Sequence, residues 1–241
     1  MSGSLAVLVV ATKPPWPPLD GGRLVLLETL RALAMAGHRV VLVAPYDPAR
    51  EDPVRAAAVL RACCEPHLVP CRSRRRVAAA LEALRGRVPV TVARHRRLEV
   101  ASLVGQLLEQ RSFDVVHAEQ AQALPQVAAA RRAGLPIVVR THNVESRLWE
   151  FSAGHRGAVL KALFRLEARR MTRWEGPALS GADLVVALSE IDLAPLAGLV
   201  AGAVEVVRVP APFARDLPAA PPLADGEPLG SLLASGGWLP G

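Results

Sequence analysis

The chain has 241 residues, of which 51% are hydrophobic and 21% are charged, a balance that is typical of a globular protein and excludes extensive disorder. Its formal net charge is +7, and nine arginines from Arg72 to Arg97 face a single acid in that segment, so the positive charge is local. No apolar run approaches the roughly 20 residues that cross a bilayer. Residues 5–11 are too short for the hydrophobic part of a signal peptide, so we expect a cytoplasmic protein.

Apolar segments alternate with helical patterns along the chain. Residues 5–11 form a nearly continuous apolar run, which predicts a parallel strand covered on both faces. A proline-rich loop follows, then a helix over 23–36 and a strand over 39–44. Further strands are predicted over 67–70, 114–118, 136–140, 182–188 and 204–209, and further helices over 52–63, 74–85, 98–110, 121–133, 147–175 (interrupted near Gly154 and Gly157) and 190–200. This order predicts an α/β fold with a doubly wound, Rossmann-like parallel sheet.

The composition changes near the end of the chain. Residues 1–209 contain the whole alternating pattern and are expected to form one α/β domain. Residues 210–228 hold six prolines, which is typical of a linker. Residues 229–241 are too few to fold alone.

Polar residues follow several of the predicted strands. They are the glycine pair Gly21-Gly22 at a helix start, residues 117–120, residues 140–146 and the pair Ser189-Glu190. Each segment alone could be a helix cap or a turn. For the glycine pair, Asp20 would cap the helix. Four such exits on one sheet edge favour a ligand cleft, because open α/β sheets bind ligands beyond the carboxyl ends of their strands.

Several familiar sequence motifs of binding and catalytic sites are absent. The sequence has no G-x-G-x-x-G after the first strand and no P-loop, H-E-x-x-H or G-x-S-x-G motif. Cys64, His67 and Cys71 match no common zinc spacing, so we expect no metal site. No aromatic residue lies among the arginines of 72–97, so base stacking is unsupported and we expect no nucleic-acid partner.

The ordered motifs resemble those of the family 4 (group 1) glycosyltransferases, which have the GT-B fold of two Rossmann-like domains. The matching segments are Gly21-Gly22, 113–119, 141–145, 167–170 and 182–189. The resemblance implies that residues 1–209 are the amino-terminal, acceptor-side domain. It also implies that residues 229–241 are the first strand of a second domain, truncated before the family's Glu-x7-Glu donor motif.

The resemblance implies retaining transfer of a sugar from a nucleotide-diphosphate donor to an envelope or exopolysaccharide acceptor, saccharide or lipid-linked, without cofactor or metal. His142 would face the transferred sugar as the catalytic residue. Gly21 and Gly22 would approach the donor phosphates or the acceptor. The remaining substrate-binding residues would be Glu119, Gln120, Asn143 and Glu145 on the acceptor side and Ser189 near the cleft floor.

Two alternatives to this interpretation remain open. The chain could be a non-catalytic, degenerate domain that binds a partner or a polysaccharide. The segment from Arg72 to Arg97 could hold the protein at the anionic inner face of the membrane, or it could be a merely solvated basic helix. Because donor contacts are expected on the second domain, we expect no sugar transfer by this chain alone.

Overall fold

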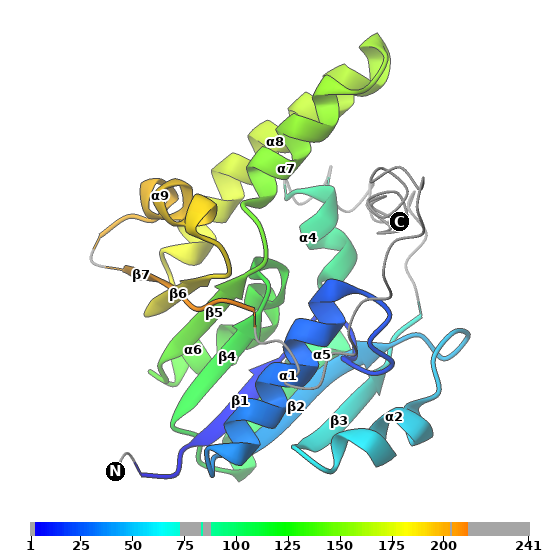
Figure 1. The fold of residues 1–241 in the computed structure, drawn as a ribbon, viewed down its shortest axis with the longest axis vertical. Helices are drawn as coiled ribbons and strands as arrows, with labels where there is room; N and C mark the ends of the chain where they lie inside the picture. The colour runs from blue at the N-terminus through cyan, green and yellow to red at the C-terminus, as the bar shows by residue number, and fades with distance from the viewer. Residues whose placement is uncertain (1–2, 73–82, 84–87, 203, 212–241) are drawn as a thin grey trace, which may run out of the picture.

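The described residues form one seven-stranded sheet in the order β3-β2-β1-β4-β5-β6-β7, and every neighbouring pair of strands is parallel (Figure 1). The computed structural model describes residues 3–72, 83, 88–202 and 204–211. The strands are β1 (Ala6–Val10), β2 (Arg39–Tyr46), β3 (Glu65–Pro70), β4 (Val115–Glu119), β5 (Ile137–Thr141), β6 (Leu184–Ala187) and β7 (Glu205–Arg208). The predicted doubly wound α/β fold is therefore confirmed.

Helices join the strands and cover the sheet. They are α1 (Gly21–Met35), α2 (Pro53–Leu60), α4 (Val90–His95), α5 (Leu98–Gln110), the 3-10 helix η1 (Ala121–Val127), α6 (Ala128–Arg132), α7 (Glu145–Gly154), α8 (Ala158–Leu179) and α9 (Glu190–Leu199). Within the described part of the chain, no helix has both the length and the apolar composition needed to cross a membrane.

Alternate residues of the strands feed two separate hydrophobic clusters, one on each face of the sheet. On one face Val7 and Val9 pack with Leu26 and Leu30 of α1. On the other face the intervening residue, Leu8, joins a larger cluster that includes side chains of α5, η1, α8 and α9. Both faces of the sheet are thus covered, which explains why β1 is apolar at every position.

The sheet changes winding direction between β1 and β4. Strands β1, β2 and β3 run outward on one side, and β4 to β7 run outward on the other. The carboxyl ends of β1 and β4 are therefore neighbours, and the loops that follow them diverge. Such a switch point leaves a crevice at the sheet edge and is the usual ligand site of this architecture.

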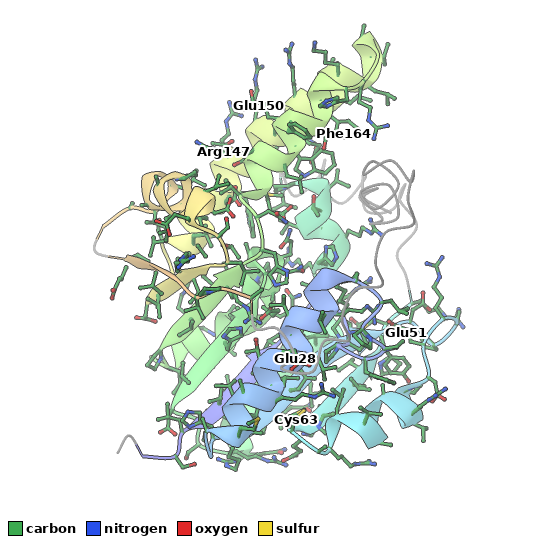
Figure 2. The ribbon with its side chains drawn as sticks, viewed as in Figure 1. Glu28, Glu51, Cys63, Arg147, Glu150 and Phe164 are labelled. Carbon is green, nitrogen blue, oxygen red and sulfur yellow. The ribbon has the colours of Figure 1, made fainter. Side chains whose placement is uncertain are left out.

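Helices α7 and α8 form a pair that projects beyond the sheet (Figure 1). Arg147 and Glu150 of α7 and Phe164 of α8 lie along it in Figure 2. The ring centroids of Trp149 and Phe164 are 4.9 Å apart, so these two aromatic side chains join the helices. The break between the helices falls at Gly154 and Gly157, where the sequence predicts it.

Two elements differ from the sequence prediction. The helix expected over 121–133 begins as the 3-10 helix η1, which contains Pro125, a residue without a backbone N–H. Helix α4 was not predicted, since its six residues are too few to show a helical period. The expected helix over 74–85 (apart from residue 83), most of the linker and residues 229–241 lie outside the described residues.

Candidate functional site

A buried polar layer lies beneath α1, at the carboxyl ends of β4 and β5. His117 and Glu119 are two residues apart on β4, so they share the face of the sheet that α1 covers. Register pairs Glu119 with Arg140 on β5. Arg140 Nη2 donates to Glu119 Oε2 at 2.6 Å, and its Nη1 donates to the hydroxyl of Thr29 in α1 at 2.6 Å. The layer thereby ties two strands to the helix above them.

Glu119 is the centre of this layer, with only 3% of its surface exposed. Its carboxylate accepts hydrogen bonds from Arg140, from His117 Nε2 at 2.8 Å and from His142 Nε2 at 2.5 Å. Burial opposes the charged form of the carboxylate. The bonds from the two histidines and the charge of Arg140 overcome that effect and hold the pKa of Glu119 well below its usual range. Glu119 is therefore an anion that fixes the groups around it.

His142 follows β5 and reaches the start of α1. A carboxylate only accepts hydrogen bonds, so Nε2 carries the hydrogen shared with Glu119. The opposite nitrogen, Nδ1, lies against Gly22, where an added Cβ would come within 3.2 Å of it. Gly22 thus allows the close approach of helix and imidazole, whereas a Cβ on Gly21 would meet nothing within 4 Å.

Gln120 adopts an unusual backbone conformation at the switch point. Its φ angle is 70°, and it is the one non-glycine residue with positive φ in the described chain. Thr12, just beyond β1, donates its hydroxyl hydrogen to Gln120 Oε1 at 2.6 Å. Strained backbone of this kind concentrates at functional sites.

The N-terminus of α7 is closed by a carboxylate from α8. Glu175 is fully buried and accepts from the backbone N–H groups of Glu145 and Ser146 at 2.8 and 3.0 Å. Burial raises the pKa of both Glu145 and Glu175, and the proximity of Glu175 raises that of Glu145 further. Gln122 also approaches Glu145, and its amide oxygen is buried without a partner. Such an unpaired buried polar group is rare in folded proteins.

The structure brings several of the predicted residues together. Gly22, Glu119, Gln120 and His142 line one small cavity together with Thr12, Lys13 and Arg23. Glu145 is the first residue of α7 and does not line this cavity. Asn143 lies between His142 and α7 in the chain, and among the described residues no hydrogen bond joins its side chain to this cluster.

Ser189 and Gly21 stand apart from that cavity. Ser189 lies at the same sheet edge, after β6, but its hydroxyl donates to Asp192 at 2.5 Å rather than to the cluster. Gly21 begins α1 without lining the cavity. In the described residues no group of three or more His, Cys, Asp or Glu side chains is arranged to hold a metal ion.

A family model described as the glycosyl transferase 4-like domain matches residues 20–212, which include every strand of the sheet but β1. The chain belongs to this family. No curated protein matches this chain significantly.

Several solved structures that are similar to this chain are GT-B glycosyltransferases. Sucrose-phosphate synthase from Thermosynechococcus elongatus matches with a TM-score of 0.52 and 14% identity, over 85% of this chain and 48% of that one. A UDP-glucosyltransferase from Polygonum tinctorium capable of glucosylating indoxyl matches with a TM-score of 0.52 and 12% identity, over 92% and 56%. Apo UGT2 from Phytolacca americana matches with a TM-score of 0.50 and 11% identity, over 87% and 53%. The chain thus spans about half the length of these proteins, and the likeness shows a shared fold.

Several residues of the site were given no individual role in the sequence analysis. Arg140 and His117 lie within the polar segments 140–146 and 117–120 that it singled out, and Thr12 lies in the proline-rich loop. The two-residue spacing of His117 and Glu119 in a predicted strand could have placed them on one face. The pairing of Glu119 with Arg140 depends on strand register, and no sequence signal gives that register.

Proposed function

We propose that this chain is the acceptor-side half of a retaining glycosyltransferase that moves a sugar from a nucleotide-diphosphate donor. The observation that supports this most strongly is the fixed contact among Glu119, His142 and Gly22 at the switch point of the sheet. This is the position at which open α/β sheets bind ligands. Membership of the glycosyl transferase 4-like family supports the same conclusion.

In this proposal His142 is the residue that contacts the transferred sugar. Its Nε2 is committed to Glu119, so Nδ1 is the atom that can orient or bond a sugar hydroxyl. Glu119 keeps the imidazole in place, since its carboxylate is itself held by Arg140 and His117. A group positioned in this way loses little freedom when the substrate binds.

The other predicted residues would contribute to the site as follows. Gly22, with Gly21, lets a phosphate or a sugar approach the positive end of α1. Gln120, Asn143 and Glu145 would shape the acceptor side, and Ser189 would lie near the cleft floor. Cations of the second domain would stabilise the departing diphosphate. The proposal includes no metal ion and no organic cofactor.

The finer parts of the proposal concern the acceptor and its location. We place the acceptor-side domain at residues 1–209, a linker at 210–228 and the beginning of a second domain at 229–241. The acceptor would be a saccharide or lipid-linked precursor of envelope or exopolysaccharide. The protein would act in the cytoplasm, held at the inner membrane face by the arginines from Arg72 to Arg97, of which the structure describes Arg72, Arg94, Arg96 and Arg97.

A transfer assay tests the function. Residues 1–209 are joined through the linker to a second domain that carries the Glu-x7-Glu motif, and transfer is measured from radiolabelled nucleotide-diphosphate sugars to saccharide and lipid acceptors. We expect turnover by the joined protein and none by residues 1–241 alone. A folded joined protein that transfers nothing from any donor would favour a non-catalytic binding domain instead.

A further inference from the structure

Helices α7 and α8 form an antiparallel hairpin that stands out from the sheet (Figure 1). Helix α7 begins beyond β5 and α8 leads back into β6, so the turn at residues 155–157 is the end of the hairpin farthest from the sheet. The ring contact of Trp149 with Phe164, and the bonds from the start of α7 to Glu175, fix the two helices to each other. The hairpin is therefore a built projection with a defined outer surface.

Exposed apolar side chains gather on this hairpin. Twelve large apolar side chains are exposed among the described residues, and five of them lie within residues 151–166, where they are 46–77% exposed. These five are Phe151, Val159, Leu160, Leu163 and Leu166. Single exposed apolar side chains are normal on a protein surface, whereas a contiguous group is typical of an interaction site.

Three of the five form a stripe along α8. Val159, Leu163 and Leu166 follow one another at intervals of four and three residues, so they share one side of the helix. Arg169 and Arg173 follow Leu166 by three and seven residues and continue the same side. Leu166, Arg169 and Arg173 also line one hollow of the surface together. The exposed side of α8 is thus apolar toward the tip of the hairpin and basic toward the sheet.

The hairpin as a whole is strongly basic. Residues 147–173 contain seven lysines and arginines and only two glutamates. Glu167 pairs with Arg170 at 2.9 Å. In the part of the chain that the structure describes, no acid lies within ion-pair distance of the other six cations, which are Arg147, Arg156, Lys161, Arg165, Arg169 and Arg173. This surface therefore requires a partner that is both apolar and negatively charged.

The charge of the hairpin separates the candidate partners. A second copy of the chain would bring the same cations against this surface, and like charges facing each other across an interface are unfavourable. An anionic lipid surface offers phosphates for the cations and acyl chains for the apolar stripe. Basic amphipathic helices are typical of proteins that lie at such a surface.

We infer that the tip of the α7–α8 hairpin docks on an anionic lipid surface. Its apolar stripe enters the boundary between the headgroups and the acyl chains, and the arginines beside it bind lipid phosphates. This contact is separate from the arginines of Arg72 to Arg97, which the proposed function places at the membrane. It also requires no sugar transfer.

Sedimentation of the whole chain with lipid vesicles tests the inference. One set of vesicles contains phosphatidylcholine alone, and the other contains phosphatidylcholine mixed with phosphatidylglycerol. We expect the chain to bind the mixed vesicles more tightly, because anionic lipid attracts the cations. Part of this binding should persist in about 1 M salt, at which charges are screened beyond about 3 Å, because the apolar stripe remains inserted.

The apolar contact has a matched pair of variants. Val159 and Val54 are each the second residue of their helix, α8 and α2, and each is 77% exposed. Helix α2 lies at the opposite end of the molecule from the tip of the hairpin (Figure 1). Val159→Glu should weaken binding to mixed vesicles by about tenfold, whereas Val54→Glu should leave it unchanged. Val159→Leu keeps the apolar character and should bind like the wild type.

The basic contact has a matched pair of double variants. Arg169→Gln with Arg173→Gln should weaken binding in low salt by about 30-fold, which corresponds to about fivefold for each cation removed from an anionic surface. Arg55→Gln with Arg132→Gln removes the same charge from exposed positions of α2 and α6, and it should leave binding unchanged. Circular dichroism should show every variant to be folded.

Four results would overturn the inference. They are equal binding to both kinds of vesicle, complete release from mixed vesicles in about 1 M salt, equal losses in Val159→Glu and Val54→Glu, and a lipid-free dimer that Val159→Glu dissociates. The last result would assign the stripe to a second copy of the chain. None of these measurements depends on turnover, so each of these results would leave the proposed sugar transfer standing.

Discussion

Glu119→Gln should destabilise the fold strongly, because it removes the negative charge at the centre of the buried polar layer. Arg140, only 3% exposed, bonds this carboxylate through Nε and Nη2 at 2.6–3.2 Å. His117 and His142 donate to the same two oxygens. A glutamine offers these donors one acceptor oxygen and turns an N–H₂ group toward the others.

The expected cost is about 3–5 kcal/mol, which is typical when one partner of a buried ion pair is removed. A domain of ordinary stability has about 5–15 kcal/mol in total, so the loss should be plain in a urea unfolding curve. Glu65→Gln is the matched control. Glu65 also pairs with an arginine and a histidine, Arg111 and His67, but its side chain is 46% exposed. Its loss should cost under about 1 kcal/mol.

Acid titration gives a second readout of the same change. The folded-state pKa of Glu119 is lowered, so its stabilising contribution is complete above the unfolded-state pKa of about 4.3 and is lost as pH falls below that value. The stability gap between wild type and Glu119→Gln should therefore be wide at pH 7 and narrow by about 1.4 kcal/mol per pH unit in acid. A gap at pH 7 no larger than that of Glu65→Gln would refute the account of this layer.

Two further substitutions separate stability from function. Glu145→Gln should stabilise the fold near pH 7, because the pKa of Glu145 is raised and its contribution to stability falls as pH rises through that pKa. In thermal unfolding this gain in stability should vanish below about pH 4. A loss of stability at pH 7 would contradict the account. Gln120→Gly should relieve about 1–3 kcal/mol of backbone strain. It should still lower sugar transfer by a joined two-domain protein, because the hydrogen bond with Thr12 is lost. Unchanged transfer would show that Gln120 is not part of the site.

The sequence predicts the fold well, because that part depends on local patterns. Continuous apolar runs indicate parallel strands buried on both faces, and Gly154 and Gly157 mark the end of α7 and the start of α8. The ends of strands could also be recognised by their polar residues. Those residues lie at one sheet edge in the structure, as a parallel sheet requires.

The contacts within the site could not be predicted in the same way. Thr12 and Gln120 are 108 residues apart, and their hydrogen bond exists only because β1 and β4 are neighbours in the sheet. The partnership of Glu119 and Arg140 requires a particular register of β4 and β5, since a shift of one residue would turn one side chain to the opposite face. The strained φ of Gln120 likewise has no signal in the sequence.

The most direct test of the central claim compares two neighbouring glycines in the joined two-domain protein. A Cβ on Gly22 would come 3.2 Å from His142 Nδ1, whereas a Cβ on Gly21 meets nothing within 4 Å, and both glycines lie in the first turn of α1. An added Cβ at that distance requires the imidazole or the helix to shift by a few tenths of an ångström, and misplacing a catalytic group lowers the rate. We predict that Gly22→Ala lowers kcat more than Gly21→Ala does, while both variants remain folded. Equal transfer by the two variants would contradict the claim that His142 beside Gly22 is the site of the reaction.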